Sequence, residues 1–217
     1  MSSVEFENSW KIIIQWLEQH SPGTLNTLNP PATDHDIESI EDHYGIKLPA
    51  DLEALYRLHN GQNTQGPDIV NFIYGQTFVP VSYGLDLHQG AIADYIEEID
   101  FPNFQNIPKH VSPVKETPLN FFPILSGHSR YALCADFKPS SEGQFGQLVF
   151  YDSEGSSVMK VCNSVTELLS VFASDLESGL YTKNQDDPLW LHASKEVDLV
   201  NWGYNRIYEK YPNGRST

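Results

Sequence analysis

Residues 30–62 read PPATDHDIESIEDHYGIKLPADLEALYRLHNGQ, and this stretch decides the fold of the chain. Its signals predict two helices joined by a tight turn. Thr33 is placed to cap the first helix, and Asp36, three residues later, is placed to form a capping box with it. Gly45 follows the first helix, where a left-handed cap favours a residue without Cβ. Pro49 predicts the start of the second helix, because a proline in the first turn loses no hydrogen bond.

Each predicted helix has one apolar face. These faces carry Ile37, Ile40 and Tyr44 in the first helix, and Leu52, Leu55, Tyr56 and His59 in the second. Gly61 is expected to end the second helix. The local signals agree with one another, so the helical pair is the firmest prediction from this sequence. None of these signals specifies chemistry.

The composition fits one larger domain, or a domain with appendages, that buries a sizeable core. The 217 residues include 29 acidic and 13 basic side chains, which gives a net charge of −16, and 40% of the residues are hydrophobic. An acidic balance disfavours nucleic acids and anionic membranes as partners and favours basic proteins or cations. Solubility alone would also explain the charge.

The two cysteines, Cys134 and Cys162, are too few for a disulfide framework, and both lie in apolar runs. We therefore expect buried free thiols. The N-terminal residues have acids near the start and no cleavage site after an apolar core, so they do not resemble a signal peptide. No apolar run approaches the roughly 18 residues that suggest a membrane span. These features predict a cytoplasmic protein.

The rest of the sequence predicts a helix before the pair and a strand-rich second half. Apolar residues recur at helical spacing over 4–20, which predicts a helix docked on the core. Short β-like runs are Ile69–Tyr74 and Thr77–Val81, and later strand candidates are Phe121–Leu125, Tyr131–Phe137, Gln147–Tyr151 and Ser157–Val161. The turn at 152–155 predicts a hairpin between the last two strands. Ser164 and Glu167 predict a capping box for a helix that ends at Gly179.

Further helices are predicted over 88–100 and in the tail, whereas the four prolines of 101–120 predict an irregular segment. We therefore divide the chain into three parts. An N-terminal helix, residues 1–29, is expected to pack on an α+β domain, residues 30–181, and a C-terminal helical extension, residues 182–217, completes the division.

The helical pair also carries an ordered pattern: an acid before a glycine, then Leu-Pro, Leu-Tyr and Asn-Gly. The residues are Glu41, Gly45, Leu48-Pro49, Leu55-Tyr56 and Asn60-Gly61. This pattern resembles the N-terminal signature of the SUKH superfamily, the Smi/Knr-like proteins. The second half is similar to the family as well, in the order of Phe122-Pro123-Ile124, the strand that ends at Asp136, residues 146–149 and the helix after Ser164.

The resemblance implies an α+β fold, a single domain whose mixed, mostly antiparallel sheet is flanked by helices. It also implies a non-catalytic role that works through protein contacts. Bacterial relatives are mostly immunity proteins that neutralise secreted toxins, whereas fungal relatives regulate cell-wall assembly. The signature residues are expected to be structural: Gly45 and Gly61 as caps, Pro49 as a helix start, and Leu55 and Tyr56 as core.

The sequence offers no constellation that predicts an enzyme. It contains no H-E-x-x-H, C-x-x-C or G-x-S-x-G motif and no Walker lysine loop. His35 and His43 would lie two helical turns apart, about 12 Å, which is too far for one metal ion. His128 and Cys134 could be imagined as a Cys–His site, but a loop histidine and a buried thiol are the simpler explanation. We predict no catalytic residue, no cofactor and no metal.

Acidic residues form the candidate binding surface for a basic protein partner. They are Asp94, Glu97, Glu98 and Asp100 in the predicted helix 88–100, and Asp152 and Glu154 at the predicted hairpin tip. A solvated helix face is the alternative for each of them. The first functional hypothesis is an immunity protein that binds a basic secreted toxin, such as a nuclease, and blocks its active site. The second is a non-catalytic regulatory scaffold of the cell-wall-assembly type.

Overall fold

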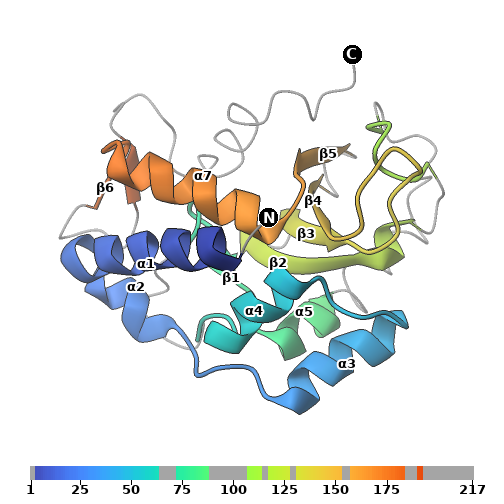
Figure 1. The fold of residues 1–217 in the computed structure, drawn as a ribbon, viewed down its shortest axis with the longest axis horizontal. Coiled ribbons are helices and arrows are strands. Elements are labelled where there is room, and N and C mark those ends of the chain that lie inside the picture. The colour runs from blue at the N-terminus through green and yellow to red at the C-terminus, as the bar shows by residue number, and fades with distance from the viewer. Residues whose placement is uncertain are drawn as a thin grey trace.

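The computed structural model describes residues 3–63, 72–87, 107–113, 117–127, 131–152, 157–183 and 190–192. In these residues, helices pack on one face of a five-stranded sheet (Figure 1). This arrangement confirms the predicted α+β class. Every described strand pair is antiparallel, so the mixed pairing expected for the sheet is not seen among these strands.

The central sheet is a meander in which each strand pairs with the next one in the sequence. Its strands are β1 Thr77–Phe78, β2 Phe121–Gly127, β3 Tyr131–Asp136, β4 Gln147–Asp152 and β5 Ser157–Cys162. β4 and β5 form the predicted hairpin, with Asp152 opposite Ser157. The register of β2 against β3 shifts between Pro123 and Leu125, where Pro123 has no N–H to donate. Two further strands, β6 Tyr181–Lys183 and β7 Trp190–His192, pair separately.

Both faces of the central strands are buried. The face toward the helices carries Phe122, Leu125, Leu133, Leu148, Phe150, Met159 and Val161. The opposite face has a smaller apolar cluster of Val111, Phe121, Ala132, Cys134, Val149, Tyr151 and Val158. Residues Ile107 and Leu119 pack against this second cluster. Cys134 and Cys162 are buried free thiols, as predicted.

Six α-helices lie in the described residues. They are α1 Ser3–His20, α2 Pro22–Thr27, α3 Asp34–Tyr44, α4 Ala50–Leu58, α5 Val81–Leu87 and α7 Val165–Glu177. α1 packs alongside α7 and buries its predicted apolar stripe (Figure 1). No described helix combines the length and the apolar character that crossing a bilayer requires.

The helical pair α3–α4 forms as its local signals predict. The Thr33 hydroxyl accepts the N–H of Asp36 at 3.2 Å, and the Asp36 carboxylate accepts the N–H of Thr33 at 2.8 Å. Gly45 caps α3 with a φ of +64°, a conformation that glycine adopts without steric strain. Pro49 is the N-cap of α4 and not its first helical residue.

The signature residues connect the helical pair to the edge of the sheet. The Glu41 carboxylate reaches across the turn after α3 and accepts the N–H of Leu48 at 3.0 Å. Leu55 and Tyr56 are in the core, as expected. The Tyr56 hydroxyl donates to the carbonyl of Val79 at 2.9 Å, just after β1. The signature therefore fixes both the turn of the pair and its contact with the sheet.

The Asn-Gly end of the signature has a different role from the one predicted. α4 ends at Leu58 with His59 as its C-cap, so Gly61 does not end the helix. Gly61 has a φ of +69°, and a Cβ at this position would lie 2.3 Å from the nitrogen of Pro80. The Asn60 side chain accepts the N–H of Val81 at 2.9 Å. Both residues hold the connection from β1 to α5.

Several local predictions need correction. The short helix α2, which begins at Pro22 directly after α1, was not predicted. α5 begins at Val81, inside a run predicted as strand, and β1 covers only Thr77–Phe78. Glu167 does not complete a capping box: its carboxylate accepts the N–H of Asn163 at 2.9 Å, one residue before the cap.

Other predictions fall outside the described residues. They concern the helix over 88–100, the first part of the run Ile69–Tyr74 and the tail helix. Within 101–120, a 3-10 turn forms at Thr117–Asn120. The division of the chain at residues 29 and 181 stays a prediction.

Candidate functional site

Only one of the six predicted acidic binding residues lies among the described residues. Asp152 ends β4 and is partly buried. The other five candidates, Asp94, Glu97, Glu98, Asp100 and Glu154, lie outside the described residues. A binding role for these six residues stays a prediction.

A hollow of about 520 Å³ lies where α1, α4 and the start of α7 meet. We call it the α1–α4 hollow. It is lined by Ser3, Phe6, Glu7, Ala50, Asp51, Ala54, Arg57, Leu58, Gln144, Ser164 and Thr166. Its volume falls within the roughly 300–1,000 Å³ that is usual for ligand pockets. Its lining combines apolar walls with charged groups.

One carboxylate of the hollow is committed to the fold. Asp51 of α4 accepts the backbone N–H of Thr166 at 2.8 Å and the Thr166 hydroxyl at 3.1 Å. The free N–H groups at a helix start favour negative charge. Asp51 supplies that charge, and Ser164 accepts the N–H of Glu167 at 3.1 Å. The N–H groups of Thr166 and Glu167, in the first turn of α7, are thereby bonded within the chain.

The one cation among the described lining residues of the hollow is also engaged. Arg57 contacts Asp34 at 2.7 Å and Glu53 at 3.3 Å. Its guanidinium also donates to the carbonyl of Ala32 at 3.4 Å. Two carboxylates therefore surround one guanidinium, so this corner is net acidic. Glu7, on α1, is exposed and has no ion pair with a described residue.

The acidic charge of the chain is unevenly distributed. Residues 3–58, which form α1 to α4, contain ten acidic and three basic side chains. Residues 107–183, which include β2–β5 and α7, contain eight acidic and six basic ones. The helical surface around the hollow is thus the more acidic of these two parts of the molecule. Sequence reasoning placed the acidic site on 94–100 and 152–154 and missed this surface.

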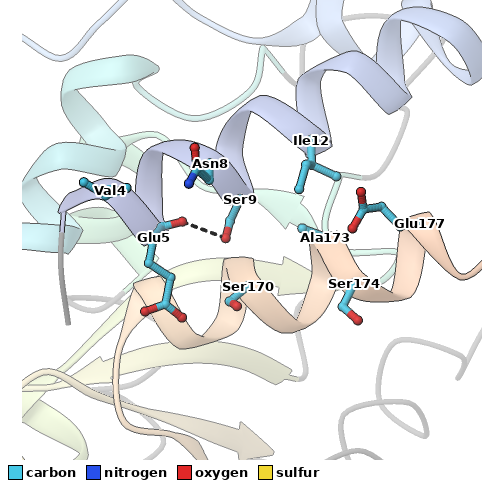
Figure 2. Close-up of a pocket in the computed structure, with 9 residues that line it drawn as sticks. All are labelled: Val4, Glu5, Asn8, Ser9, Ile12, Ser170, Ala173, Ser174 and Glu177. Atoms are coloured by element: carbon cyan, nitrogen blue, oxygen red, sulfur yellow. Dashed lines mark hydrogen bonds between the residues drawn. The ribbon is translucent and has the colours of Figure 1, made fainter.

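A second, more open groove of about 430 Å³ follows the contact between α1 and α7 (Figure 2). Small residues let the two helices approach each other, among them Ser9, Ser170 and Ala173. Figure 2 shows Glu5 near one end of the groove and Glu177 near the other. Val4, which is 59% exposed, also lines it. The first turn of α1 therefore lies between this groove and the α1–α4 hollow.

The described residues contain no site that suggests catalysis. Burial raises the pKa of both thiols, Cys134 and Cys162, well above the ordinary value. Such thiols are poor nucleophiles, since the thiolate is the reactive form. His128, the imagined partner of Cys134, lies outside the described residues. No group of three His, Cys, Asp or Glu side chains placed to hold a metal ion occurs in the described ranges.

The hollow was beyond the reach of sequence reasoning. Its lining comes from four segments that are far apart in the chain, represented by Phe6, Ala54, Gln144 and Thr166. The local pattern of each segment predicts its own structure and says nothing of the other three. The acidic excess of residues 3–58 was the one available signal, and it requires counting charges by segment.

Comparisons with known proteins give the chain a family. The family model described as SMI1 / KNR4 family (SUKH-1) matches residues 31–171. The chain is 24% identical over 196 residues to the cell wall biosynthesis/cell cycle regulator smi1 of Schizosaccharomyces pombe, covering 82% of this chain and 38% of that protein. It is 22% identical over 222 residues to the cell wall assembly regulator SMI1 of Saccharomyces cerevisiae, covering 87% and 44%.

A third relative is the glucan synthesis regulatory protein of Neurospora crassa, which is 20% identical over 250 residues, covering 97% of this chain and 47% of that protein. The chain spans less than half the length of these three relatives. The family match covers most of the chain, including the helical pair and the central sheet. The chain belongs to the SMI1/KNR4 (SUKH-1) family.

Proposed function

We propose that this chain is a non-catalytic regulator of the cell-wall-assembly type, and that it acts by binding other proteins. The observation that carries this proposal is its family match together with the names of its relatives, which are regulators of cell-wall biosynthesis, cell-wall assembly and glucan synthesis. Those names describe much longer proteins, so the proposal concerns the share of their function that this region supplies.

A non-catalytic role agrees with the chemistry of the described residues. The two thiols are buried and have raised pKa values. The charged side chains of the α1–α4 hollow, Asp51 and Arg57, are held by partners within the chain. These contacts fit a role for both side chains in positioning helices. An acidic, helical surface suits recognition of a basic protein.

A chimaera in budding yeast tests the proposal. The chain replaces the segment that it matches in the yeast regulator, in a strain that lacks the native gene. We expect the chimaera to restore wall glucan content and growth under cell-wall stress. A Cys134→Ser, Cys162→Ser version should restore both equally, because the proposal gives the thiols no catalytic role. A stably expressed chimaera that restores neither would contradict the proposal.

Toxin neutralisation is the second candidate function. The observation that favours it is the acidic excess on the helical surface, which would complement a basic toxin. The names of the relatives favour the regulator instead. Co-expression with the product of an adjacent toxin-like gene would decide for neutralisation if the chain alone protects the host cell from that product.

A further inference from the structure

We propose that the α1–α4 hollow docks a basic segment of a partner protein and takes up one large apolar side chain of that segment. This inference rests on the proposed function, because it names the chemistry of the partner that the regulator would bind. It is carried by two properties of the hollow: its walls and its charges.

The walls of the hollow suit an apolar side chain. Phe6 of α1 forms part of one wall, and Ala50, Ala54 and Leu58 of α4 form part of the other. Small residues on α4 leave the space open, since a long side chain at Ala54 would fill it. An interface typically gains most of its binding energy from a few anchor side chains that enter such pockets. The hollow offers a pocket of this kind on a surface built from rigid helices.

The charges around the hollow select a basic segment. Glu7 lines it and is exposed, and Arg57 is surrounded by the carboxylates of Asp34 and Glu53. The Asp34 side chain is 84% exposed and the Glu53 side chain 40%. Lysine or arginine side chains that flank the apolar anchor would therefore meet carboxylates on the rim. An acidic or neutral segment would gain no such attraction.

The start of α7 does not turn the hollow into an anion site. A helix start normally attracts phosphate or carboxylate groups. Here the N–H of Thr166 is already bonded to Asp51, and the N–H of Glu167 to Ser164. A phosphate would have to displace Asp51 from within the chain and would face Glu7 as well. A basic partner is the better match.

Two exposed apolar residues are sequence neighbours of lining residues but line other surfaces. Val4 is 59% exposed on the first turn of α1, and Phe145 is 44% exposed beside the lining residue Gln144. The loop of Phe145 is held against α4, because a Cβ on Gly146 would lie 2.4 Å from Pro49. Val4 lines the α1–α7 groove, and the Phe145 ring packs against Phe137, so neither belongs to the lining of the hollow. The carboxylates of Asp34 and Glu53 beside Arg57 extend the charged rim beyond the hollow, so a basic peptide fits this surface better than a small apolar molecule.

Peptide selection tests the inference directly. A library of random peptides displayed on phage is selected on the full chain, and the dominant peptide is synthesised with a fluorescent label. We expect lysine or arginine around a leucine, phenylalanine or another large apolar residue. Binding is measured by fluorescence anisotropy, and the affinity should fall as salt rises, because screening weakens the attraction between the basic peptide and the acidic rim.

Substitutions locate the bound peptide. Ala54→Arg fills the hollow and adds a positive charge, so we expect the affinity to fall by at least about tenfold. Glu7→Lys changes only an exposed rim charge, and we expect it to slow association by about threefold. The matched control is Glu18→Lys, the same charge reversal on the same helix about 16 Å further along. Glu18 is exposed and does not line the hollow, so the control should bind like the unchanged chain.

Each other outcome overturns the inference. Selection that yields no peptide, or peptides without basic residues, would reject a basic segment as the occupant. Peptides that bind equally to Glu7→Lys and Glu18→Lys, or to a folded Ala54→Arg chain, would place the site elsewhere. A dimer of the unchanged chain that Ala54→Arg converts to a monomer would show that a second copy fills the hollow.

If the docking test fails while the yeast chimaera restores glucan, the proposed function stands without this site. If the chimaera fails while the peptide maps to the hollow, the hollow is a docking site and the proposed function is rejected.

Discussion

The helices α1–α4 and the sheet β2–β5 use their residues in different ways. The segment that forms the helices carries ten acidic and three basic side chains and leaves many of them exposed. The sheet is buried on both faces, and its strands contribute mostly apolar side chains to two clusters. The helical layer therefore carries the exposed charge and the α1–α4 hollow, whereas the sheet is the frame on which that layer is held.

The two regions also bury carboxylates differently. In the helical pair, the Glu41 carboxylate accepts hydrogen bonds from the Lys47 side chain and from the N–H of Leu48, and both bonds lower its pKa. At the end of β3, Asp136 is fully buried, and burial raises its pKa to about 6 although Gln147 and the N–H of Lys138 bond to it. Folding therefore stabilises the charged form of Glu41 and destabilises the charged form of Asp136. Substitutions in each region can separate these two effects.

The largest expected effect is the loss of a core side chain from the helical pair. Leu55 is 2% exposed and packs in the main core, so Leu55→Ala should lower the free energy of unfolding by about 2–5 kcal/mol. Leu58→Ala, on the same helix but only partly buried, should cost less. Urea unfolding measures both. A Leu55→Ala midpoint that hardly moves would mean that the helical layer is not part of the cooperative core.

The second prediction concerns the buried acid of the sheet. Because the folded pKa of Asp136 lies above the ordinary value of 3.8, the folded state binds more protons than the unfolded state between about pH 4 and pH 6. The contribution of Asp136 to the free energy of unfolding therefore falls as pH rises from about 4 to about 6. The rise in pKa to about 6 corresponds to roughly 3 kcal/mol.

Asp136→Asn isolates this contribution, since asparagine resembles the protonated acid. We expect the variant to gain stability relative to the unchanged chain as pH rises from about 4 to about 6, with no further relative change above that range. Urea unfolding at a series of pH values gives the difference curve. A flat difference curve would show that Asp136 is not destabilised by burial when it is charged.

Local signals could predict the helical pair α3–α4, and long-range contacts explain part of what they missed elsewhere. Thr33, Asp36 and Gly45 act within a few residues, so their roles in capping α3 follow from spacing alone. α5 was missed because Val81 and Tyr83 favour strands locally. The N–H of Val81 donates a hydrogen bond to the side-chain oxygen of Asn60, which is 21 positions away. No pattern within the segment records that bond.

The candidate site was less predictable than the fold. The α1–α4 hollow needs Phe6, Ala54 and Gln144 to meet, and this depends on how α1 and the loop before β4 pack on α4. Asp51 shows the same limit. Its spacing predicts an exposed acid in the first turn of a helix, whereas its partner is Thr166, 115 residues later. The spacing of residues in the sequence identifies which side chains lie on the surface of a helix, but not which groups they contact in the folded chain.

The third prediction compares helix caps in the two regions. Thr33 caps α3 with bonds in both directions, whereas Ser164 caps α7 with a bond in one direction. Each substitution by alanine should lower the free energy of unfolding by about 1 kcal/mol. Thr33→Ala should have the larger effect, because it also removes the hydroxyl that donates to the Asp36 carboxylate. Equal effects in thermal unfolding would show that the bond from the Thr33 hydroxyl to the Asp36 carboxylate adds nothing.

The smallest expected effect is at the surface end of the Glu41 contact. The Lys47 side chain is 88% exposed, so solvent screens its ion pair with Glu41. Lys47→Met should therefore destabilise the chain at pH 7 by less than Thr33→Ala does. Urea unfolding at low and neutral pH, each at two salt concentrations, measures the difference from the unchanged chain.

The pH dependence of the Lys47→Met effect should have the opposite sign to that of Asp136. The pKa of Glu41 is lowered in the folded state. Its contribution to the free energy of unfolding is therefore complete above the ordinary pKa of 4.5, and this contribution is lost as pH falls through the pKa of the folded state. The stability difference between the unchanged chain and Lys47→Met should therefore shrink with acid, and also with salt at neutral pH. A difference that persists in acid would assign the effect to packing of the lysine stem across the turn and not to its charge.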